Sequence, residues 1–233
     1  MRRLLLLSIL SAPLWAEMMD PINDLRLGPA IVMGPSIKES ITTAAGAKAS
    51  YDWKNTGDIA LRYEAGYWQG MSREGRSRSG FIWSVGASYL AMDVTPQSYE
   101  TGGVSTPNVR RDLALNLKEY GVVLGAGWST QPSPGSLGDW NWEIMPVVRG
   151  GLLTIDTVTP GANPEIANGS APFWEAGLTG GVVLSDKNWL IGLCAGWLYG
   201  TSEVKVDLPN GDKSELTVTR NGPEASLQVG IRF

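Results

Sequence analysis

The stretch Ser226-Leu-Gln-Val-Gly-Ile-Arg-Phe233 alternates strictly between apolar residues and small or polar ones. Successive side chains of a β-strand point to opposite faces, so every second residue shares a face. The stretch therefore predicts a β-strand with one wholly apolar face. That face carries Leu227, Val229, Ile231 and Phe233.

The same alternation recurs upstream and indicates an all-β chain. Beyond the first residues, no apolar run reaches the ~20 residues that a membrane-spanning helix needs. Segments rich in Gly, Pro, Asn and Asp, which are typical of turns, separate the alternating runs. With the final strand at 225–233, we predict strands at 188–201, 172–185, 140–154, 115–128, 79–92 and 58–70.

The two faces of these strands differ in size. Around residue 192, Trp189 and Leu193 share one face, whereas Gly192 and Gly196 share the other. A soluble β-protein would place its large apolar side chains inward and leave glycines on the solvent face, which weakens strands. A transmembrane barrel instead turns its apolar face to lipid. We predict a closed, antiparallel, up-and-down transmembrane β-barrel, with a secreted, soluble, ligand-binding β-sandwich as the alternative.

An even number of strands requires one more near the N-terminus. Residues 41–54 alternate, and so do residues 25–38, but the second segment contains Pro29 and Pro35. Proline cannot donate to a strand ladder, and a closed barrel has no edge where this would be harmless. We therefore favour 41–54 as the first of eight strands. Residues 17–40 become a periplasmic or lumenal segment, with 25–38 left as the other possible first strand, and 41–233 form the barrel.

The first sixteen residues have the pattern of a cleavable signal peptide. A basic start, Met1-Arg-Arg3, precedes the apolar run Leu4–Leu10, and Ala16 supplies a small residue at the cleavage position. We expect residues 1–16 to direct export of the chain to a Gram-negative-type cell envelope.

Composition excludes several functions. The 233 residues include no histidine and one cysteine, so Ser-His-Asp catalysis, His-ligated metals and internal disulfides are absent. With 19 basic against 23 acidic residues, the net charge of −4 does not suit a nucleic-acid binder. We expect no enzymatic activity, no catalytic residue, no cofactor and no metal site.

Connection lengths indicate an orientation. The links 93–114, 155–171 and 202–223 are long, whereas 70–78, 129–139 and 185–188 are shorter. Outer-membrane barrels have short periplasmic turns and longer extracellular loops. We therefore place the three long links outside the cell, where they would contact a surface ligand.

Charged residues on the small-residue face would lie in the lumen and must pair there. The alternation of each strand predicts two ion-pair clusters with a structural role. The predicted outer cluster contains Arg62, Glu64, Arg149 and Glu175, and the inner one contains Glu143 and Arg232.

Aromatic residues mark both ends of the predicted strands. Trp189 and Tyr199 lie ten residues apart on one face, which corresponds to ~25 Å along the membrane normal at a tilt of ~40°. This spacing suits the two interfacial girdles of a membrane barrel. We assign to these girdles Tyr120, Trp128, Trp140, Trp142, Trp189, Trp197 and Tyr199.

These features together resemble the small eight-stranded outer-membrane barrels, namely the OmpA transmembrane domain, OmpX and the opacity-type adhesins. The resemblance covers the architecture of the mature chain, and its most specific residue is Phe233. It implies that the barrel assembly machinery recognises Phe233, together with Ile231 and Val229, as a sorting signal. It also implies a monomer in outer-membrane lipid with a structural or adhesin-like role, or alternatively a small porin-like diffusion channel.

Overall fold

The computed structural model describes residues 19–55, 59–73, 79–101, 104–107, 115–130, 139–157, 169–186, 188–207 and 211–233. The predicted signal peptide, residues 1–16, lies outside these ranges. No helix in the described part of the chain has the length and hydropathy to cross a membrane.

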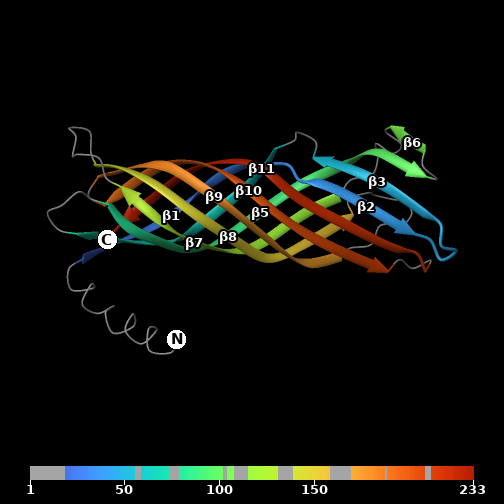
Figure 1. Cartoon of the computed structure of the whole chain (residues 1–233), viewed down its shortest axis with the longest axis horizontal. Coiled ribbons are helices and arrows are strands. Elements are labelled where there is room, and N and C mark those ends of the chain that lie inside the picture. The colour runs from blue at the N-terminus through green and yellow to red at the C-terminus, as the bar shows by residue number, and fades with distance from the viewer. Residues whose placement is uncertain are drawn as a thin grey trace, which may run out of the picture.

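Eight long antiparallel strands form a closed up-and-down barrel (Figure 1). Each pairs with its neighbour along the chain, and β1 also pairs with β11, which closes the sheet. This confirms the predicted fold class and excludes the β-sandwich. The strands are β1 (Met19–Met33), β4 (Ile59–Arg73), β5 (Ser79–Thr101), β7 (Leu115–Thr130), β8 (Asp139–Thr157), β9 (Gly169–Asp186), β10 (Trp189–Asp207) and β11 (Lys213–Arg232).

The preference for 41–54 as the first strand was wrong, because β1 occupies that place in the barrel. Leu27 pairs with Val229 of β11 on one side and with Ala65 of β4 on the other. The register between β1 and β11 skips Gly28 and Pro29 and resumes at Ala30. Proline, which has no N–H to donate, therefore sits where the ladder is already interrupted.

Gly28 is required at this interruption. A Cβ atom at this position would lie 1.8 Å from the carbonyl oxygen of Leu227, so no larger residue allows β11 to approach so closely. Glycine and proline together thus let β1 close the barrel although its sequence resembles an edge strand.

Residues 41–54 do form strands, but in a hairpin beyond the ends of β1 and β4. β2 (Ser36–Thr42) pairs with β11, and β3 (Lys48–Asn55) pairs with β5. The hairpin therefore takes the place of β1 and β4 between β11 and β5. Gly46, with φ of 83°, supplies the left-handed conformation in its turn. A short strand, β6 (Val104–Pro107), pairs with the outer end of β5.

Met19 of β1 and Arg232 of β11 lie at one end of the barrel. We call the opposite end the outer end (right in Figure 1). There the strands run further than predicted. The 19 residues of β10 span ~48 Å along the barrel axis at a tilt of ~40°, well beyond the ~25 Å of an apolar belt. Most of the predicted loop 202–223 is therefore the hairpin β10–β11. The predicted loops 93–114 and 155–171 likewise give up 93–101, 155–157 and 169–171 to strands.

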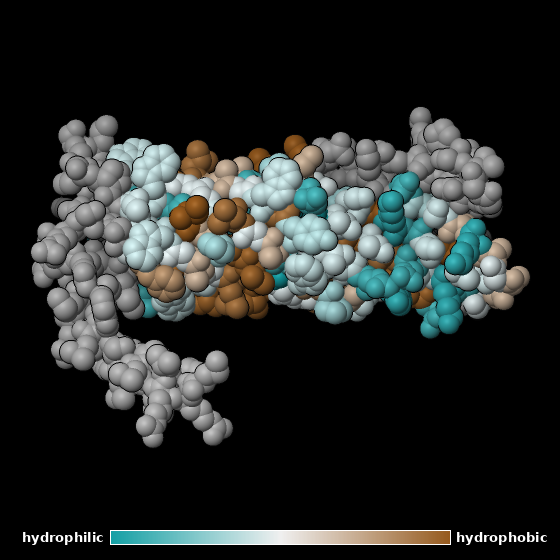
Figure 2. Space-filling view, viewed as in Figure 1, coloured by the Kyte–Doolittle hydropathy of each residue, from teal (hydrophilic) through white to brown (hydrophobic). Residues whose placement is uncertain are grey.

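The barrel consists of two sections with opposite polarity. We call the part of the barrel nearer the chain termini the membrane section. There large apolar side chains point outward, and Leu193 is 67% exposed. In the outer extension, which comprises β2, β3, β6 and the outer ends of β5 and β7–β11, they point inward, and Leu216 is 1% exposed. Figure 2 shows teal, hydrophilic residues gathered towards the outer end, whereas brown, hydrophobic residues lie among pale ones along the rest of the visible wall.

The outer extension has an apolar core, which corrects our expectation of small and charged residues throughout the lumen. Its sequence still alternates, but apolar residues here occupy the inward positions. The buried members include Ile37, Leu90, Met92, Val94, Leu115, Leu117, Leu153, Ile155, Phe173, Val204, Leu216 and Val218.

Candidate functional site

Seven charged side chains form a layer inside the barrel, beneath the apolar core of the extension. At its centre, Arg62 of β4 donates through one Nη to both carboxylate oxygens of Glu175 of β9, at 2.8 and 2.7 Å. Each of these two side chains is 1% exposed. Arg62 also lies 3.7 Å from Glu119 and 3.5 Å from Glu224. The pair formed by Arg62 and Glu175 links opposite sides of the barrel wall.

Two further arginines complete this layer, which we call the upper charge layer. Arg149 donates to Glu64 at 2.7 Å and to Glu224 at 3.0 Å. Arg220 pairs with Glu175 at 2.7 Å and also contacts Glu119. Since burying an unpaired charge is costly, three arginines shared among four carboxylates hold one another in place. The members are Arg62, Glu64, Glu119, Arg149, Glu175, Arg220 and Glu224.

A lower charge layer lies towards the end that carries the chain termini. Arg26 donates to both oxygens of Glu143, at 2.6 and 2.8 Å, and to Asp24 at 2.9 Å. Arg232 donates to Asp24 at 2.8 Å and to the hydroxyl of Ser185 at 2.8 Å. The layer thus connects β1, β8, β9 and β11.

The structure places all six sequence-predicted charged residues inside the barrel. Arg62, Glu64, Arg149 and Glu175 lie together, whereas Glu143 and Arg232 are joined only through Arg26 and Asp24. Those two linking residues were missed because β1 was not favoured as a strand. Glu119, Arg220 and Glu224 were also missed, although continued alternation of β7 and β11 places them inward.

The seven aromatic residues assigned to girdles all lie on the barrel exterior, between 43% and 59% exposed. Trp128, Trp140, Trp142 and Trp189 are near the inner ends of their strands, whereas Tyr120, Trp197 and Tyr199 lie eight to ten residues further out on the same wall. Additional aromatics join the outer level, since Tyr89 contacts Tyr120 at a ring distance of 5.2 Å and Trp174 contacts Tyr199 at 5.9 Å.

The terminal segment forms the seam that closes the barrel. Val229 and Ile231 lie outward between β1 and β10, with Leu27 and Leu25 as their partners in β1. The backbone N–H of Phe233 donates to the carbonyl of Asn23 at 3.0 Å, and its side chain is 65% exposed.

Two small cavities lie within the described part of the interior. One lies beside Trp68 and Gln228 and the other beside Phe173 and Arg220, and each is about 10 Å³. That volume accommodates roughly one water molecule. Among the described residues, no three His, Cys, Asp or Glu side chains gather to hold a metal ion.

No protein-family model and no curated protein matches the chain. Among solved structures, it is similar to Ail, the attachment invasion locus protein of Yersinia pestis, at 12% identity and a TM-score of 0.36, covering 92% of this chain and 100% of Ail. It is also similar to the outer membrane protein OprG of Pseudomonas aeruginosa at 11% identity and to the outer membrane protease OmpT of Escherichia coli at 13%. Both comparisons give a TM-score of 0.42 and cover 92% of this chain and 97% of the other.

The chain's own strand pairing and surface define its class. The barrel is closed, its membrane section is apolar outside and holds both paired charges and buried apolar side chains inside, and aromatic residues border that section at two levels. This is the arrangement of an eight-stranded transmembrane β-barrel.

Proposed function

We propose that this protein is a closed, non-enzymatic outer-membrane barrel that presents its outer extension to a partner outside the cell. The filled interior of the barrel is the main observation that supports this proposal. Both charge layers and the apolar core of the extension cross the barrel within the described residues, so a hydrated solute meets three successive packed layers. A plugged barrel of this kind serves as a scaffold rather than as a pore.

The outer extension supports a surface role. Its strands continue past the outer aromatic level, so β-sheet supports the exposed side chains that the structure describes there. Its outward side chains include Lys38, Glu203, Lys205 and Glu215, which mix both signs of charge. A rigid support for exposed polar residues favours recognition, because little ordering entropy is lost on binding.

Planar-bilayer recordings test the closed barrel. We expect purified wild-type protein to give no steady conductance steps. The matched variant is Arg62→Ala with Glu175→Ala, which removes the central pair without leaving either partner charged, and it should conduct more than the wild type. Steady steps from the wild type would instead support the small diffusion channel.

A hairpin replacement tests the surface role. Met33 and Ile59 are register partners, so an Asn-Gly turn can replace residues 34–58. We expect cells that display this variant to adhere less than wild-type cells to a panel of immobilised matrix proteins and glycans. Heat-modifiable migration on a gel checks that the barrel still forms. Equal adhesion by folded variant and wild type would contradict a role for the hairpin, as would wild-type adhesion no higher than that of empty-vector cells.

We also propose that Phe233, with Ile231 and Val229, is recognised by the barrel assembly machinery. Phe233→Ser should lower the folded fraction in outer membranes several-fold. Phe81→Ser is the matched control, since Phe81 is also an exposed phenylalanine on the inner part of the wall. Equal insertion of both variants would overturn the special role of Phe233.

A further inference from the structure

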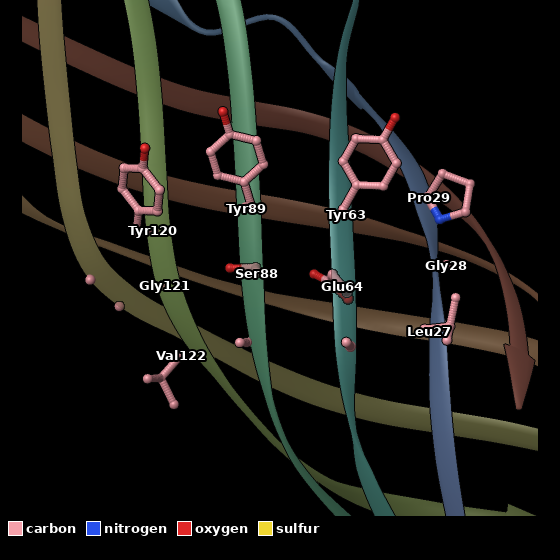
Figure 3. Close-up of a pocket in the computed structure, with 14 residues that line it drawn as sticks. Leu27, Gly28, Pro29, Tyr63, Glu64, Ser88, Tyr89, Tyr120, Gly121 and Val122 are labelled. Carbon is pink, nitrogen blue, oxygen red and sulfur yellow. The ribbon is translucent and has the colours of Figure 1, made fainter. Parts of the chain in front are cut away.

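An apolar groove crosses the outside of the membrane section on β1, β4, β5 and β7 and reaches Gly150 and Gly151 of β8. Its volume is about 810 Å³, which lies within the range of small-molecule sites. Figure 3 shows Tyr63, Tyr89 and Tyr120 side by side along one rim, on three neighbouring strands. The groove is a feature of the lipid-facing wall, since these three rings are 52%, 37% and 50% exposed.

The strand register explains the depression. Tyr63 pairs with Tyr89, and Tyr89 pairs with Tyr120, so the rings form one cross-strand row. The next row of outward-facing residues lies towards the inner end of the barrel. It contains Ala65 paired with Ala87, which are flanked by Leu27 and Val122. Two methyl groups between bulky neighbours leave a dip in an otherwise filled belt.

The tyrosine rim lies where the wall changes from apolar to polar. In Figure 3 the three hydroxyls point the same way, away from Leu27 and Val122 and towards the outer end. Two residues beyond Tyr120 on the same face, Lys118 contacts Asp156 at 3.2 Å. Lys118 is one-third exposed and keeps donors free for another acceptor. An occupant would thus meet hydrocarbon contacts below the rim and hydrogen-bond donors above it.

We propose that this groove binds the acyl chain of a membrane lipid, with the ester or phosphate oxygens of that lipid at the tyrosine hydroxyls and Lys118. The change from apolar to polar residues across the rim favours a lipid as the occupant. A lipid in the leaflet on this side has its apolar chain below its oxygen-rich headgroup, in the same order as the groove and its rim. Aromatic residues at this level suit such contacts, because their rings are apolar and their hydroxyls are polar.

A second copy of the chain fits the groove less well. The floor at Ala65 and Ala87 lies a side chain's depth below the tyrosine rings, and barrel walls are convex. A second barrel would therefore rest on the rim and leave the floor unfilled, whereas a flexible chain reaches it. Filling the floor gains dispersion contacts that a gap forfeits.

Photo-crosslinking tests the proposal. The folded full-length protein is placed in vesicles that contain a phospholipid with a diazirine in its acyl chain, and labelled peptides are mapped by mass spectrometry. We expect labelling of the wild type to concentrate on β4, β5 and β7 around the groove. Ala65→Phe with Ala87→Phe fills the floor and should lower that labelling several-fold. Labelling spread evenly around the belt would overturn the proposal.

Ala195→Phe is the matched control, because Ala195 also faces outward in the membrane section but lies on β10, away from the groove. It should leave labelling at the groove unchanged, and heat-modifiable migration verifies folding of each variant. A second variant, Tyr63→Phe/Tyr89→Phe/Tyr120→Phe, keeps the rings and should lower labelling by removing the hydroxyls; unchanged labelling would contradict the headgroup contact. A wild-type dimer in native mass spectrometry that the filled-groove variant loses would instead identify a second copy as the occupant.

Discussion

Strands β10 and β11 each pass through both sections of this barrel, and the same alternation has opposite meanings in the two. In the membrane section Leu193 points outward and is 67% exposed, whereas in the outer extension Leu216 points inward and is 1% exposed. The two strands pair in one uninterrupted register from Trp189 and Ile231 to Asp207 and Lys213. The surrounding solvent, lipid or water, therefore decides which face of a strand carries the apolar side chains.

The two interiors differ accordingly. Where lipid surrounds the wall, the narrow lumen holds Arg62, Glu175 and the other paired charges, together with buried apolar side chains such as Trp68. Where water surrounds the barrel, the interior is an ordinary apolar core. A closed interior is thus achieved twice, by ion pairing in one section and by hydrophobic burial in the other.

The largest expected effect comes from breaking the upper charge layer. Glu175→Ala leaves Arg62 buried without its closest acceptor and removes one of the two carboxylates that contact Arg220, which should cost about 3–5 kcal/mol of the free energy of unfolding. Urea titration in detergent micelles measures this loss. Glu203→Ala, which removes an exposed pair with Lys205 in the extension, should change stability little. Equal losses would show that the charge layer is not a stabilising unit.

Truncation of a leucine should distinguish the two sections next. Leu216→Ala creates a cavity in the apolar core of the extension and should cost about 2–5 kcal/mol. Leu193→Ala should cost less, because lipid or detergent chains refill the space outside the wall. The same urea titration compares the two, and a larger loss at Leu193 would contradict the assignment of the sections.

An introduced charge reverses the comparison. Leu193→Arg places a guanidinium in the apolar belt and should cost about 2–4 kcal/mol near the midplane. Ser40→Arg, on the outward face of β2, remains in water and should be close to neutral. Unfolding in lipid vesicles is the appropriate measurement, and a neutral Leu193→Arg would place that face away from lipid.

The smallest expected effect is a pH dependence in the extension. The hydrogen bond and charge of Glu203 raise the pKa of Glu215, and hydrogen bonds from Glu215 and Lys205 lower the pKa of Glu203. The Glu215 contribution is therefore present below its unfolded pKa and lost as pH rises through its raised pKa. The Glu203 contribution is present above its unfolded pKa and lost as pH falls through its lowered one.

Glu215→Gln tests this pair. The amide still donates to Glu203 but cannot ionise, so the urea midpoint should rise slightly at pH 7 and match the wild type near pH 4. A midpoint that rises equally at both pH values would show that repulsion between the two carboxylates is not the cause.

Much of the site followed from alternation alone. Residues such as Arg149 and Glu175 could be placed inward because their neighbours in sequence, Val148 and Trp174, are apolar and were expected to face lipid. The structure shows both neighbours exposed on the outer wall. Asp24 and Arg26 could not, because they lie on a strand whose Pro29 argued against it. That argument fails only because Gly28 permits a local break in the ladder with β11, a feature of three-dimensional pairing.

The sequence by itself determined that the chain is all-β, that its strands have one apolar face, and which side chains share a face. These are properties of neighbouring residues, and a period of two is enough to reveal them. Only the tertiary structure decided which segment closes the barrel, that residues 36–55 extend it, and which arginine meets which carboxylate. Those outcomes depend on pairing between distant strands, where register and available space select among partners that local alternation leaves equivalent.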